Sequence, residues 1–307
     1  MRKENPEWAA EIGGESSLSA FGQKISDYKQ LAKFRLTATV VFTSVMAYII
    51  AAPFGVNWMV ALLLASGGFL VTAAANALNQ VLEKDFDKLM TRTKNRPVAA
   101  GRMTVSEAVL SAGFMSLIGI ILLALVNHWV AFLGTLSLVI YAFIYTPLKR
   151  VSTIAVAVGA VPGALPMLIG VAAAEGQITT FALMLFAIQF LWQFPHFWAI
   201  GWVGFDDYKK AGYKLIPAVN GERDPQIGWH SFIYAMFLAL VCGSLPLLSL
   251  TGIGAGIFLV LLSLGYAYFG LNLYRNKDRK SAMQLMFSSF AYLPLVILIL
   301  FLDKFLF

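Results

Sequence analysis

The chain has 307 residues, of which 59% are hydrophobic and only 13% are charged, and its mean hydropathy is +0.74. Soluble globular domains carry about 25% charged residues, so this composition excludes a water-exposed body of this size and predicts a lipid-embedded protein. The net charge of +7 would suit a nucleic-acid partner, but only if the charges were clustered for that purpose. With a single cysteine, Cys242, the chain has no intramolecular disulfide and no cysteine-based metal site.

Residues 1–30 are predicted to form a polar arm ahead of the first apolar run. They include several glutamates and no apolar core before a small-residue cleavage site. Cleavable secretory signals need such a core, and mitochondrial transit peptides are rich in arginine and poor in acids. The expected organisation is therefore a cytoplasmic N-terminal arm at 1–30, followed by a single membrane domain at 31–307.

Nine runs of mostly apolar residues are each long enough for a bilayer-spanning helix, which needs about 20 residues. The runs are continuous rather than alternating, and they are far longer than the roughly ten residues of a β-barrel strand. The predicted fold is therefore all-α, an integral membrane bundle of nine transmembrane helices. The predicted spans lie near residues 33–53, 57–80, 105–126, 129–147, 153–173, 179–203, 228–249, 252–273 and 284–302.

The positive charges follow a topological pattern. All 23 Lys and Arg residues except Lys304 fall in the N-terminal arm or in every second connection between the predicted spans. By the positive-inside rule these segments are cytoplasmic, which places the N-terminus inside and the C-terminus outside. This distribution accounts for the net charge and excludes a nucleic-acid partner. The connections 2–3 and 6–7 are long and carry charges of both signs, so the active face is predicted to be cytoplasmic.

A column of oxygen-bearing side chains ends the second span. Asn79, Glu83 and Asp87 follow an i, i+4, i+8 spacing, which stacks them on one face of a helix. Such oxygen ligands suit Mg²⁺, which proteins commonly hold through one or two carboxylates together with substrate phosphates. Arg92 and Arg96 follow closely, and arginine is suited to bidentate contact with phosphate.

An ordinary charged loop next to the membrane is the alternative interpretation of this stretch. Asp85 projects to the opposite side of the helix, where a solvated charge or a partner for Lys88 is the expected role. Asn79, however, lies inside the predicted span and Glu83 at its boundary, where polar groups are costly and usually functional. The location of Asn79 and Glu83 in and at the edge of the membrane therefore favours a functional site over an ordinary charged loop.

A second polar and aromatic segment surrounds the end of the sixth span. On a continuous helix, His196 and Asp207 would lie about 20° apart in azimuth, with His196 deeper in the membrane. Carboxylates at the mouth and aromatic rings beneath suggest a diphosphate anchored by a metal above an apolar pocket. Trp198 and Trp202 are candidate pocket residues, and a core or interfacial aromatic is the alternative for both. For His196 a ligand, a hydrogen-bond donor and a structural contact all stay open.

The connection between the fourth and fifth spans adds further candidates. It begins with Tyr145 and carries Lys149 and Arg150, which either reach the same diphosphate or are only positive-inside charges. In the fifth span, Pro162, Gly163 and Pro166 are candidates for a break in the helix that would leave room beside a cavity, because broken spans are tolerated where they line a pocket.

These segments resemble the UbiA-type intramembrane prenyltransferase superfamily. The likeness rests on the column Asn79, Glu83 and Asp87, on Arg92-Thr-Lys-Asn-Arg96-Pro97, on Tyr145-Thr-Pro-Leu-Lys149-Arg150 and on the acidic loop after the sixth span. The branch of the superfamily that farnesylates heme is the most similar, through Asp85-Phe-Asp87 up to Pro97 and through Pro195-His196-Phe-Trp with Asp206-Asp207-Tyr208. The resemblance covers roughly residues 30–305.

The resemblance implies Mg²⁺-assisted loss of diphosphate from farnesyl diphosphate and coupling of its allylic carbon to a vinyl group of heme B, which gives heme O once water adds. Asn79, Glu83, Asp87 and Asp207 would then organise Mg²⁺ and the diphosphate. Arg92, Arg96, Lys149 and Arg150 would neutralise the leaving group. His196 would lie near the heme, and the substrate pocket would include Tyr145, Trp198 and Trp202.

Two features of the sequence depart from the general pattern of the superfamily. Glu83 stands where the superfamily commonly has aspartate, and this lengthens the reach of the carboxylate by one methylene. Val203, Asp207 and Ala211 stand where quinone-type members have three carboxylates. The second departure argues against a symmetric site with two metal ions and favours the heme branch.

Prenylation of a quinone or chlorin precursor is the alternative within this enzyme class, and a heme-binding absorbance band would separate the two. A secondary transporter is the alternative from another class, but the sequence has no convincing internal repeat and its acidic residues cluster at one face. The expected location is the plasma membrane of a bacterium. The expected partners are the lipid bilayer, farnesyl diphosphate and heme B, with a heme A synthase as a further downstream partner.

Overall fold

The computed structural model describes residues 15–52 and 55–306. Within these ranges nine helices are long and apolar enough to cross a membrane, which confirms the predicted all-α, nine-span architecture. The observed spans follow the predicted ones closely, and the last helix begins earlier than predicted, at Arg279. The first part of the predicted arm, residues 1–14, lies outside the described residues.

The described part of the chain forms nine spans and five further elements that lie at their ends. The spans in chain order are α2 (Phe34–Ala51), α3 (Trp58–Leu82), α5 (Val105–Ala124), the fourth span (His128–Leu148), α8 (Ala155–Glu175), α9 (Thr180–Val203), α11 (Ile227–Leu247), α12 (Ile253–Asn276) and α13 (Arg279–Leu306). The fourth span consists of α6 (His128–Val139), the π-helical turn η2 (Ile140–Tyr145) and α7 (Thr146–Leu148). The five further elements are α1 (Glu15–Leu31), α4 (Lys84–Asp87), α10 (Phe205–Lys210), β1 (Ala218–Val219) and β2 (Glu222–Arg223).

Polar caps fix where several spans begin. The side chains of Asn57, Thr104, Asn127 and Thr179 each accept a hydrogen bond from a backbone N–H in the first turn of the helix that follows. The first N–H groups of a helix have no partner within it, so such caps stabilise the helix start by about 1 kcal/mol. Four of the spans therefore start at residues that the sequence itself marks.

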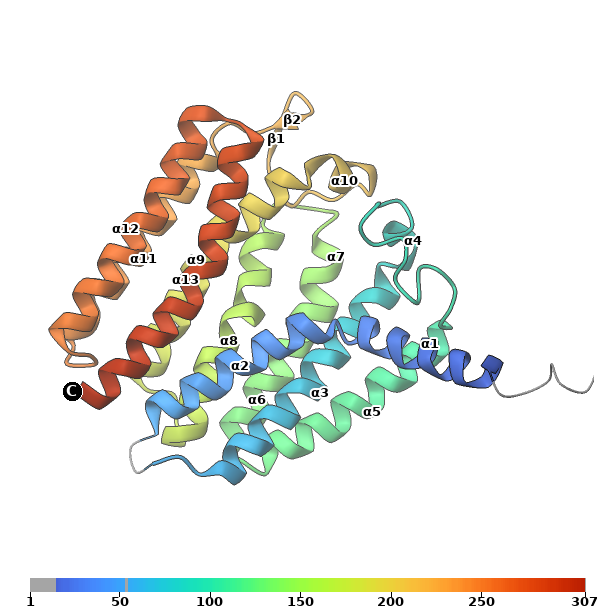
Figure 1. Cartoon of the computed structure of the whole chain (residues 1–307), viewed down its shortest axis with the longest axis horizontal. Coiled ribbons are helices and arrows are strands. Elements are labelled where there is room, and N and C mark those ends of the chain that lie inside the picture. Colours follow the sequence, from blue (N-terminus) through green and yellow to red (C-terminus); the bar gives the residue numbers. More distant parts are fainter. Residues whose placement is uncertain (1–14, 53–54, 307) are drawn as a thin grey trace, which may run out of the picture.

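Helix α8 is the centre of the bundle. In α8, 78% of the most apolar stretch is buried inside the protein, whereas the other spans bury between 22% and 39%. It packs against α2, α6 and α9, while α11 pairs with α12 and α3 pairs with α5. Figure 1 shows α4, α10 and the β1–β2 hairpin at one end of the bundle and the C-terminus at the other. We call the end with α4 and α10 the loop end.

The connection between α9 and α11 contains a small hairpin that was not predicted. Strands β1 and β2 pair antiparallel around Asn220 and Gly221, whose φ angles are +53° and +80°. Positive φ at both central residues is typical of a type I′ turn, for which Asn-Gly is a preferred sequence. Arg223 of β2 donates to Asp206 at 2.8 Å and to the Trp202 carbonyl at 3.0 Å, so the hairpin is bound to the end of α9 and to α10.

The described part of the predicted arm is helical. Helix α1 precedes α2, and ion pairs connect it to α5 and to the segment that leads into α5. Arg102 Nε lies 2.9 Å from Asp27 Oδ1, and Lys24 Nζ lies 2.6 Å from Glu107 Oε1. Asp27 is buried, so the first pair is shielded from water more than a surface pair would be.

Candidate active site

A cavity of about 410 Å³ lies between α2, α3, η2, α8 and α9 and extends to the connections that follow α4 and α10. Most of its wall along the spanning helices is apolar, and its charged residues are at the loop end. The charged residues that line it are Lys33, Glu83, Asp87, Arg92, Arg96 and Lys149. This set holds four cationic and two anionic side chains, so an anion is the expected occupant of this polar end.

Glu83 and Asp87 are buried, and each is paired with a cation. Glu83 Oε1 accepts a hydrogen bond from the Lys149 ammonium at 2.7 Å, and Arg96 Nη1 contacts both oxygens of Asp87 at 2.7 and 2.8 Å. Glu83 is 4% exposed and Asp87 0%, and a buried carboxylate is tolerated only when it is paired in this way. Arg96 also lies 3.9 Å from Glu83, so the four side chains form one network.

The pKa shifts at the polar end of the cavity show which further charges would stabilise this network. Burial works to raise the pKa of Glu83, but Lys149, Lys33 and Arg96 outweigh it and hold that pKa below its usual value. For Asp87, burial and the charge of Glu83 raise the pKa although Arg96 works to lower it. Burial, together with repulsion from Arg96 and Lys149, lowers the pKa of Lys33 to about 7. The ionised form of Asp87 would be favoured by a further cation, and that of Lys33 by an incoming anion.

Asn79 reaches the same polar end from the last turn of α3. Its Oδ1 accepts a hydrogen bond from Lys33 Nζ at 3.0 Å, and its Nδ2 donates to Thr146 Oγ1 at 3.0 Å. Asn79 is 1% exposed, so these two bonds determine how its amide is oriented. The oxygen is therefore directed toward the charged side chains, as a metal ligand would require.

The predicted column of Asn79, Glu83 and Asp87 persists although helix α3 ends within it. Helix α3 ends before Glu83, which is its C-cap residue with φ −99° and ψ 3°. The backbone N–H of Asp87 nevertheless donates to the Glu83 carbonyl at 2.8 Å, so α4 continues the helical turn. Asn79, Glu83 and Asp87 all line the cavity, as their spacing predicts.

The donor set fits Mg²⁺ bound together with a diphosphate. Among residues 15–52 and 55–306, no three His, Cys, Asp or Glu side chains are close enough together to hold a metal ion by themselves. Two carboxylates and one amide oxygen leave coordination positions for phosphate oxygens, which is how Mg²⁺ is commonly bound at phosphate-transferring sites. All three donors are oxygens, which suits a hard cation rather than a soft one.

The connections that follow α4 and α10 are hydrogen-bonded to each other. Asp207 Oδ2 accepts from the Arg92 backbone N–H at 3.3 Å, and Arg92 Nη2 donates to Tyr208 Oη at 2.8 Å. Arg92 and Tyr208 line the cavity, whereas Asp207 is not part of its wall. The predicted alignment of His196 and Asp207 on one helix is wrong, because Gly204 separates α9 from α10.

Lys149 and Arg150 are adjacent but lie in different surroundings. Lys149 lines the cavity, and its ammonium lies 4.6 Å from the centre of the Tyr145 ring. The Arg150 guanidinium lies 3.9 Å from the centre of the Phe86 ring, and Arg150 is not part of the cavity wall. Tyr145 reaches the wall from the π-helical turn η2, and π-helical turns occur frequently at functional sites.

His196 lines the cavity from the membrane-embedded part of α9. Its Nδ1 lies 2.7 Å from Ser289 Oγ of α13, and its ring stacks on Trp192 with 4.7 Å between the ring centres. The Ser289 hydroxyl donates to the Met286 carbonyl at 2.5 Å. Its oxygen is then free to accept from His196 Nδ1–H, which is the tautomer in which Nε2 carries no proton.

Trp198 and Trp202 lie outside the cavity wall, so a core position, the alternative for both, describes them better than a pocket role. Trp198 packs edge-on against Tyr234 with 5.2 Å between ring centres, and Trp202 is 5% exposed. On an α-helix they are rotated from His196 by about 200° and 240°, which turns both away from the cavity.

Helix α8 is continuous through Pro162 and Pro166, so the prediction of a broken span is wrong. Pro162 and Gly163 nevertheless line the cavity. A Cβ added at Gly163 would lie 1.9 Å from Gln193 Oε1, so the Gln193 amide would have to move if a side chain replaced glycine here. Gln193 is held there by a hydrogen bond of 3.0 Å from its Nε2 to the Ala160 carbonyl.

Three residues of this region were missed in the sequence: Lys33, Tyr213 and Ser289. Lys33 was counted only as a positive-inside charge, although it lies directly before a span where it can reach inward. Tyr213 and Ser289 belong to no motif. The only signal for Ser289 was a polar residue within an apolar span, which is common enough for hydroxyls to carry little weight.

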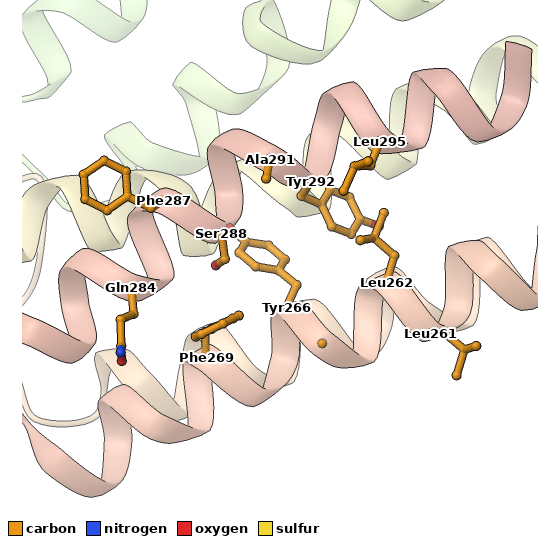
Figure 2. A pocket seen from close by; sticks show the side chains of 11 residues that line it. Leu261, Leu262, Tyr266, Phe269, Gln284, Phe287, Ser288, Ala291, Tyr292 and Leu295 are labelled. Atoms are coloured by element: carbon orange, nitrogen blue, oxygen red, sulfur yellow. The ribbon is translucent and has the colours of Figure 1, made fainter.

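A second hollow of about 520 Å³ lies between α12 and α13. Figure 2 shows Tyr266 and Phe269 on one helix and Ser288 and Tyr292 on the other along this hollow. Within the part of the chain that the structure describes, no charged side chain lines it. It therefore offers nothing that would hold a diphosphate, and the smaller cavity with the polar end is the candidate active site.

Comparison with known proteins identifies the family to which this constellation belongs. Residues 40–291 match the UbiA prenyltransferase family. The chain belongs to this family. The match spans most of the membrane domain, including both loop-end connections, and it confirms the family that the motifs predicted. Membership makes the chain a membrane-embedded prenyltransferase.

Several similar proteins share one name. The protoheme IX farnesyltransferase of Christiangramia forsetii is 42% identical over 92% of this chain and 94% of its own length. That of Cytophaga hutchinsonii is 44% identical over 90% of this chain and 97% of its own length. The mitochondrial protoheme IX farnesyltransferase of Homo sapiens is 34% identical over 88% of this chain and 60% of its own length.

Solved structures share the UbiA fold at low sequence identity. A structure described for digeranylgeranylglyceryl phosphate synthase has a TM-score of 0.78 at 16% identity and covers 93% of this chain and all of that one. A UbiA homologue from Archaeoglobus fulgidus bound to DMAPP and Mg²⁺ has a TM-score of 0.73 at 14% identity and covers 92% of this chain and all of its own. These similarities agree with the nine-span bundle described above.

Proposed function

We infer that this protein transfers the farnesyl group of farnesyl diphosphate to a vinyl group of heme B with release of diphosphate, and that addition of water to the farnesylated vinyl group then yields heme O. The observation that carries the proposal is a cavity with four cations and two carboxylates at one end and an apolar wall behind them. The names of the relatives at 42% and 44% identity supply the two substrates. A membrane-embedded site suits them, because both the farnesyl chain and heme are largely apolar.

The cations at the polar end of the cavity stabilise the leaving group. Loss of diphosphate from the allylic carbon places negative charge on the departing oxygen, and fixed cations lower the energy of that transition state. Arg92, Arg96, Lys149 and Lys33 are the side chains at this end that bear or can bear positive charge. Arg150 lies against the Phe86 ring and outside the cavity wall, so it stabilises the leaving group only from a greater distance.

Asn79, Glu83 and Asp87 are the residues that would hold Mg²⁺. When bound, Mg²⁺ neutralises diphosphate charge and so assists its departure. The protein contributes two buried carboxylates and an oriented amide oxygen to this task. Asp207 contributes indirectly, by holding the connection that carries Arg92.

The apolar part of the cavity protects the reactive allylic group from water. A prenyl cation reacts with any water that reaches it, so its pocket must be dry and lined by groups that tolerate positive charge. The rings of Tyr145 and Trp192 line the wall and can stabilise such a cation. His196 lines the same wall, where a heme iron or a reacting vinyl group would meet it.

The proposed location is the plasma membrane of a bacterium, with the loop end in the cytoplasm. Farnesyl diphosphate would then enter from the cytoplasm, and heme from the membrane or its surface. The product would pass to an enzyme that modifies heme O further, of which a heme A synthase is the expected example.

The decisive experiment is conversion of heme B by the purified protein. With Mg²⁺ and labelled farnesyl diphosphate, the wild type is expected to convert heme B into a more hydrophobic, labelled heme, and removal of Mg²⁺ by a chelator is expected to stop the reaction. Glu83→Gln and Asp87→Asn are expected to lose at least about 100-fold in kcat/KM, because each removes a carboxylate that would hold Mg²⁺ against the diphosphate. The matched control is Asp85→Asn, since the Asp85 side chain is 63% exposed and pairs with Lys88.

Two results would contradict the proposal. A wild-type protein that binds farnesyl diphosphate but leaves heme B unchanged would show that heme is not the acceptor. Wild-type turnover by both Glu83→Gln and Asp87→Asn would show that the polar end of the cavity is not the site. Folding of each variant is checked by thermal unfolding in detergent, because breaking a buried ion pair also costs stability.

A further inference from the structure

Tyr213 has a buried hydroxyl for which the protein provides no partner. The residue is 8% exposed, and its Oη makes no hydrogen bond with any described residue. Buried polar groups in native proteins are nearly always paired, and an exception needs an explanation, of which a ligand is one. Tyr213 lines the cavity at its polar end, where a ligand would reach it.

The ring of Tyr213 has a structural role that the hydroxyl does not share. The ring packs with Met90 and Ala211 in a small apolar cluster that joins the two loop-end connections. It also lies 6.3 Å from the Phe86 ring and 6.2 Å from the Tyr208 ring, measured between ring centres. Phenylalanine would fill the same place equally well, so packing explains the ring but leaves the oxygen unexplained.

The backbone holds Tyr213 against the residues that surround the proposed diphosphate. Gly212 has φ +70°, a conformation that favours glycine, and it turns the chain back after α10. The Tyr213 N–H donates to the Tyr208 carbonyl at 2.9 Å, and the Lys214 N–H donates to the Lys149 carbonyl at 2.7 Å. Tyr213 is therefore fixed beside Lys149 before any ligand binds.

The Tyr213 hydroxyl can donate a hydrogen bond to a ligand. A phenolic O–H is both a hydrogen-bond donor and an acceptor. The Lys149 ammonium lies 5.8 Å from the centre of the ring. A donor beside cations is well placed to meet an anionic oxygen.

We propose that Tyr213 is a direct contact of the substrate diphosphate, and that its hydroxyl donates a hydrogen bond to a diphosphate oxygen in the bound state. This inference rests on the proposed function only as far as the prenyl diphosphate, and it does not depend on which acceptor is prenylated. It adds to the four cations a neutral donor, which binds the same oxygens without adding charge.

Tyr213→Phe tests the inference, because this substitution removes one oxygen and keeps the ring. The full-length protein is titrated with inorganic pyrophosphate and Mg²⁺, and binding is followed by thermal shift and calorimetry. A hydrogen bond to a charged oxygen is worth roughly a 10- to 100-fold change in affinity, so the variant is expected to bind pyrophosphate weaker by that factor. Without ligand, its melting temperature is expected to equal or exceed that of the wild type, because a buried unpaired group has been removed.

Tyr268→Phe is the matched control, since Tyr268 is 60% exposed on α12 and is remote from the cavity wall. It is expected to leave both pyrophosphate affinity and melting temperature unchanged. Unchanged pyrophosphate affinity in Tyr213→Phe would overturn the inference. A lower melting temperature of Tyr213→Phe without ligand would also overturn it, because the hydroxyl would then have a partner within the protein.

The heme assay keeps this inference separate from the proposed function. If the wild type converts heme B and Tyr213→Phe binds pyrophosphate normally, only the inference fails. If the wild type leaves heme B unchanged while Tyr213→Phe weakens pyrophosphate binding, the inference stands and the proposed acceptor fails.

Discussion

Each oxygen ligand proposed for Mg²⁺ accepts a hydrogen bond from a cationic side chain. Lys33 bonds to the amide, and Lys149 and Arg96 bond to the two carboxylates, at distances between 2.7 and 3.0 Å. These pairs make burial of the carboxylates tolerable before substrate binds. When a metal and a diphosphate occupy the site, the same cations can bond to phosphate oxygens while the carboxylates face the metal. The site is therefore charged in advance for both parts of its ligand.

Lys33→Met is expected to weaken binding of farnesyl diphosphate. Lys33 lines the cavity and is one of only four cationic residues there among those described, so its loss removes a charge-assisted hydrogen bond to the diphosphate. KM for farnesyl diphosphate is expected to rise roughly 10- to 100-fold in steady-state assays. Lys29→Met is the control, because Lys29 is exposed on α1. An unchanged KM together with a lower melting temperature would show that Lys33 has only a structural role.

Spacing alone separated the functional acid from the solvated one at this site. Asp85 and Asp87 are two residues apart, so a helix directs them to different sides. The Asp85 side chain is 63% exposed and paired with Lys88, as predicted, and the Asp87 side chain is fully buried. The partner of Asp87 could not be assigned in the same way, because Arg96 lies in an irregular segment that has no period to follow.

At the scale of the elements, close contact between α2 and α8 depends on Gly170. A Cβ at Gly170 would lie 2.1 Å from the Ser44 carbonyl oxygen and 2.7 Å from Ala47 Cβ. Small residues at such crossings let membrane helices approach closely enough for their backbones to pack. The position of α2, which carries part of the cavity wall, therefore depends on this residue.

Gly170→Ala is expected to destabilise the protein. Neither the Ser44 carbonyl nor the α2 backbone can move without separating the helices, and overpacking of this kind typically costs about 1–3 kcal/mol. The melting temperature in detergent is expected to fall by several degrees. Gly113→Ala in α5 serves as control, because a Cβ there meets nothing within 4 Å. Equal melting temperatures for the two variants would show that α2 and α8 can adjust.

The two loop-end connections act together through Asp207. Asp207→Ala is expected to lower kcat/KM for farnesyl diphosphate by up to about tenfold, because one hydrogen bond that holds the Arg92 backbone is lost. The Mg²⁺ concentration that gives half-maximal activity is expected to stay unchanged. Asp206→Ala is the control, since the Asp206 side chain is 74% exposed and bonds to Arg223. A raised Mg²⁺ requirement in Asp207→Ala would instead identify Asp207 as a metal ligand.

At the scale of the whole molecule, charge and apolar surface define how the bundle sits in a membrane. Large apolar side chains such as Phe114 and Phe258 are each 64% exposed on the outside of the bundle, as lipid-facing residues are. Together with the cationic connections, this surface predicts a cytoplasmic loop end.

This orientation can be tested with single cysteines, because the native Cys242 is fully buried. Trp58→Cys, at an exposed position on the far end of α3, is expected to react with a membrane-impermeant maleimide in intact cells. Lys94→Cys, exposed at the loop end, is expected to react only after the membrane is permeabilised. The opposite pattern of labelling would invert the proposed topology.

The sequence by itself determined the membrane class, the nine spans, the column of Asn79, Glu83 and Asp87, and the family. These features depend on local properties, namely apolar length, helical spacing and short motifs, which the chain carries wherever it folds. Tertiary structure decided which cation pairs with which carboxylate, that Trp198 and Trp202 face away from the cavity, and that Asp207 holds a neighbouring connection. It also brought Lys33 and Tyr213 to the polar end of the cavity. Such relations depend on where the helices end and on the turns between distant segments. A shift of one residue at a helix end or in a turn changes the direction of the side chains after it.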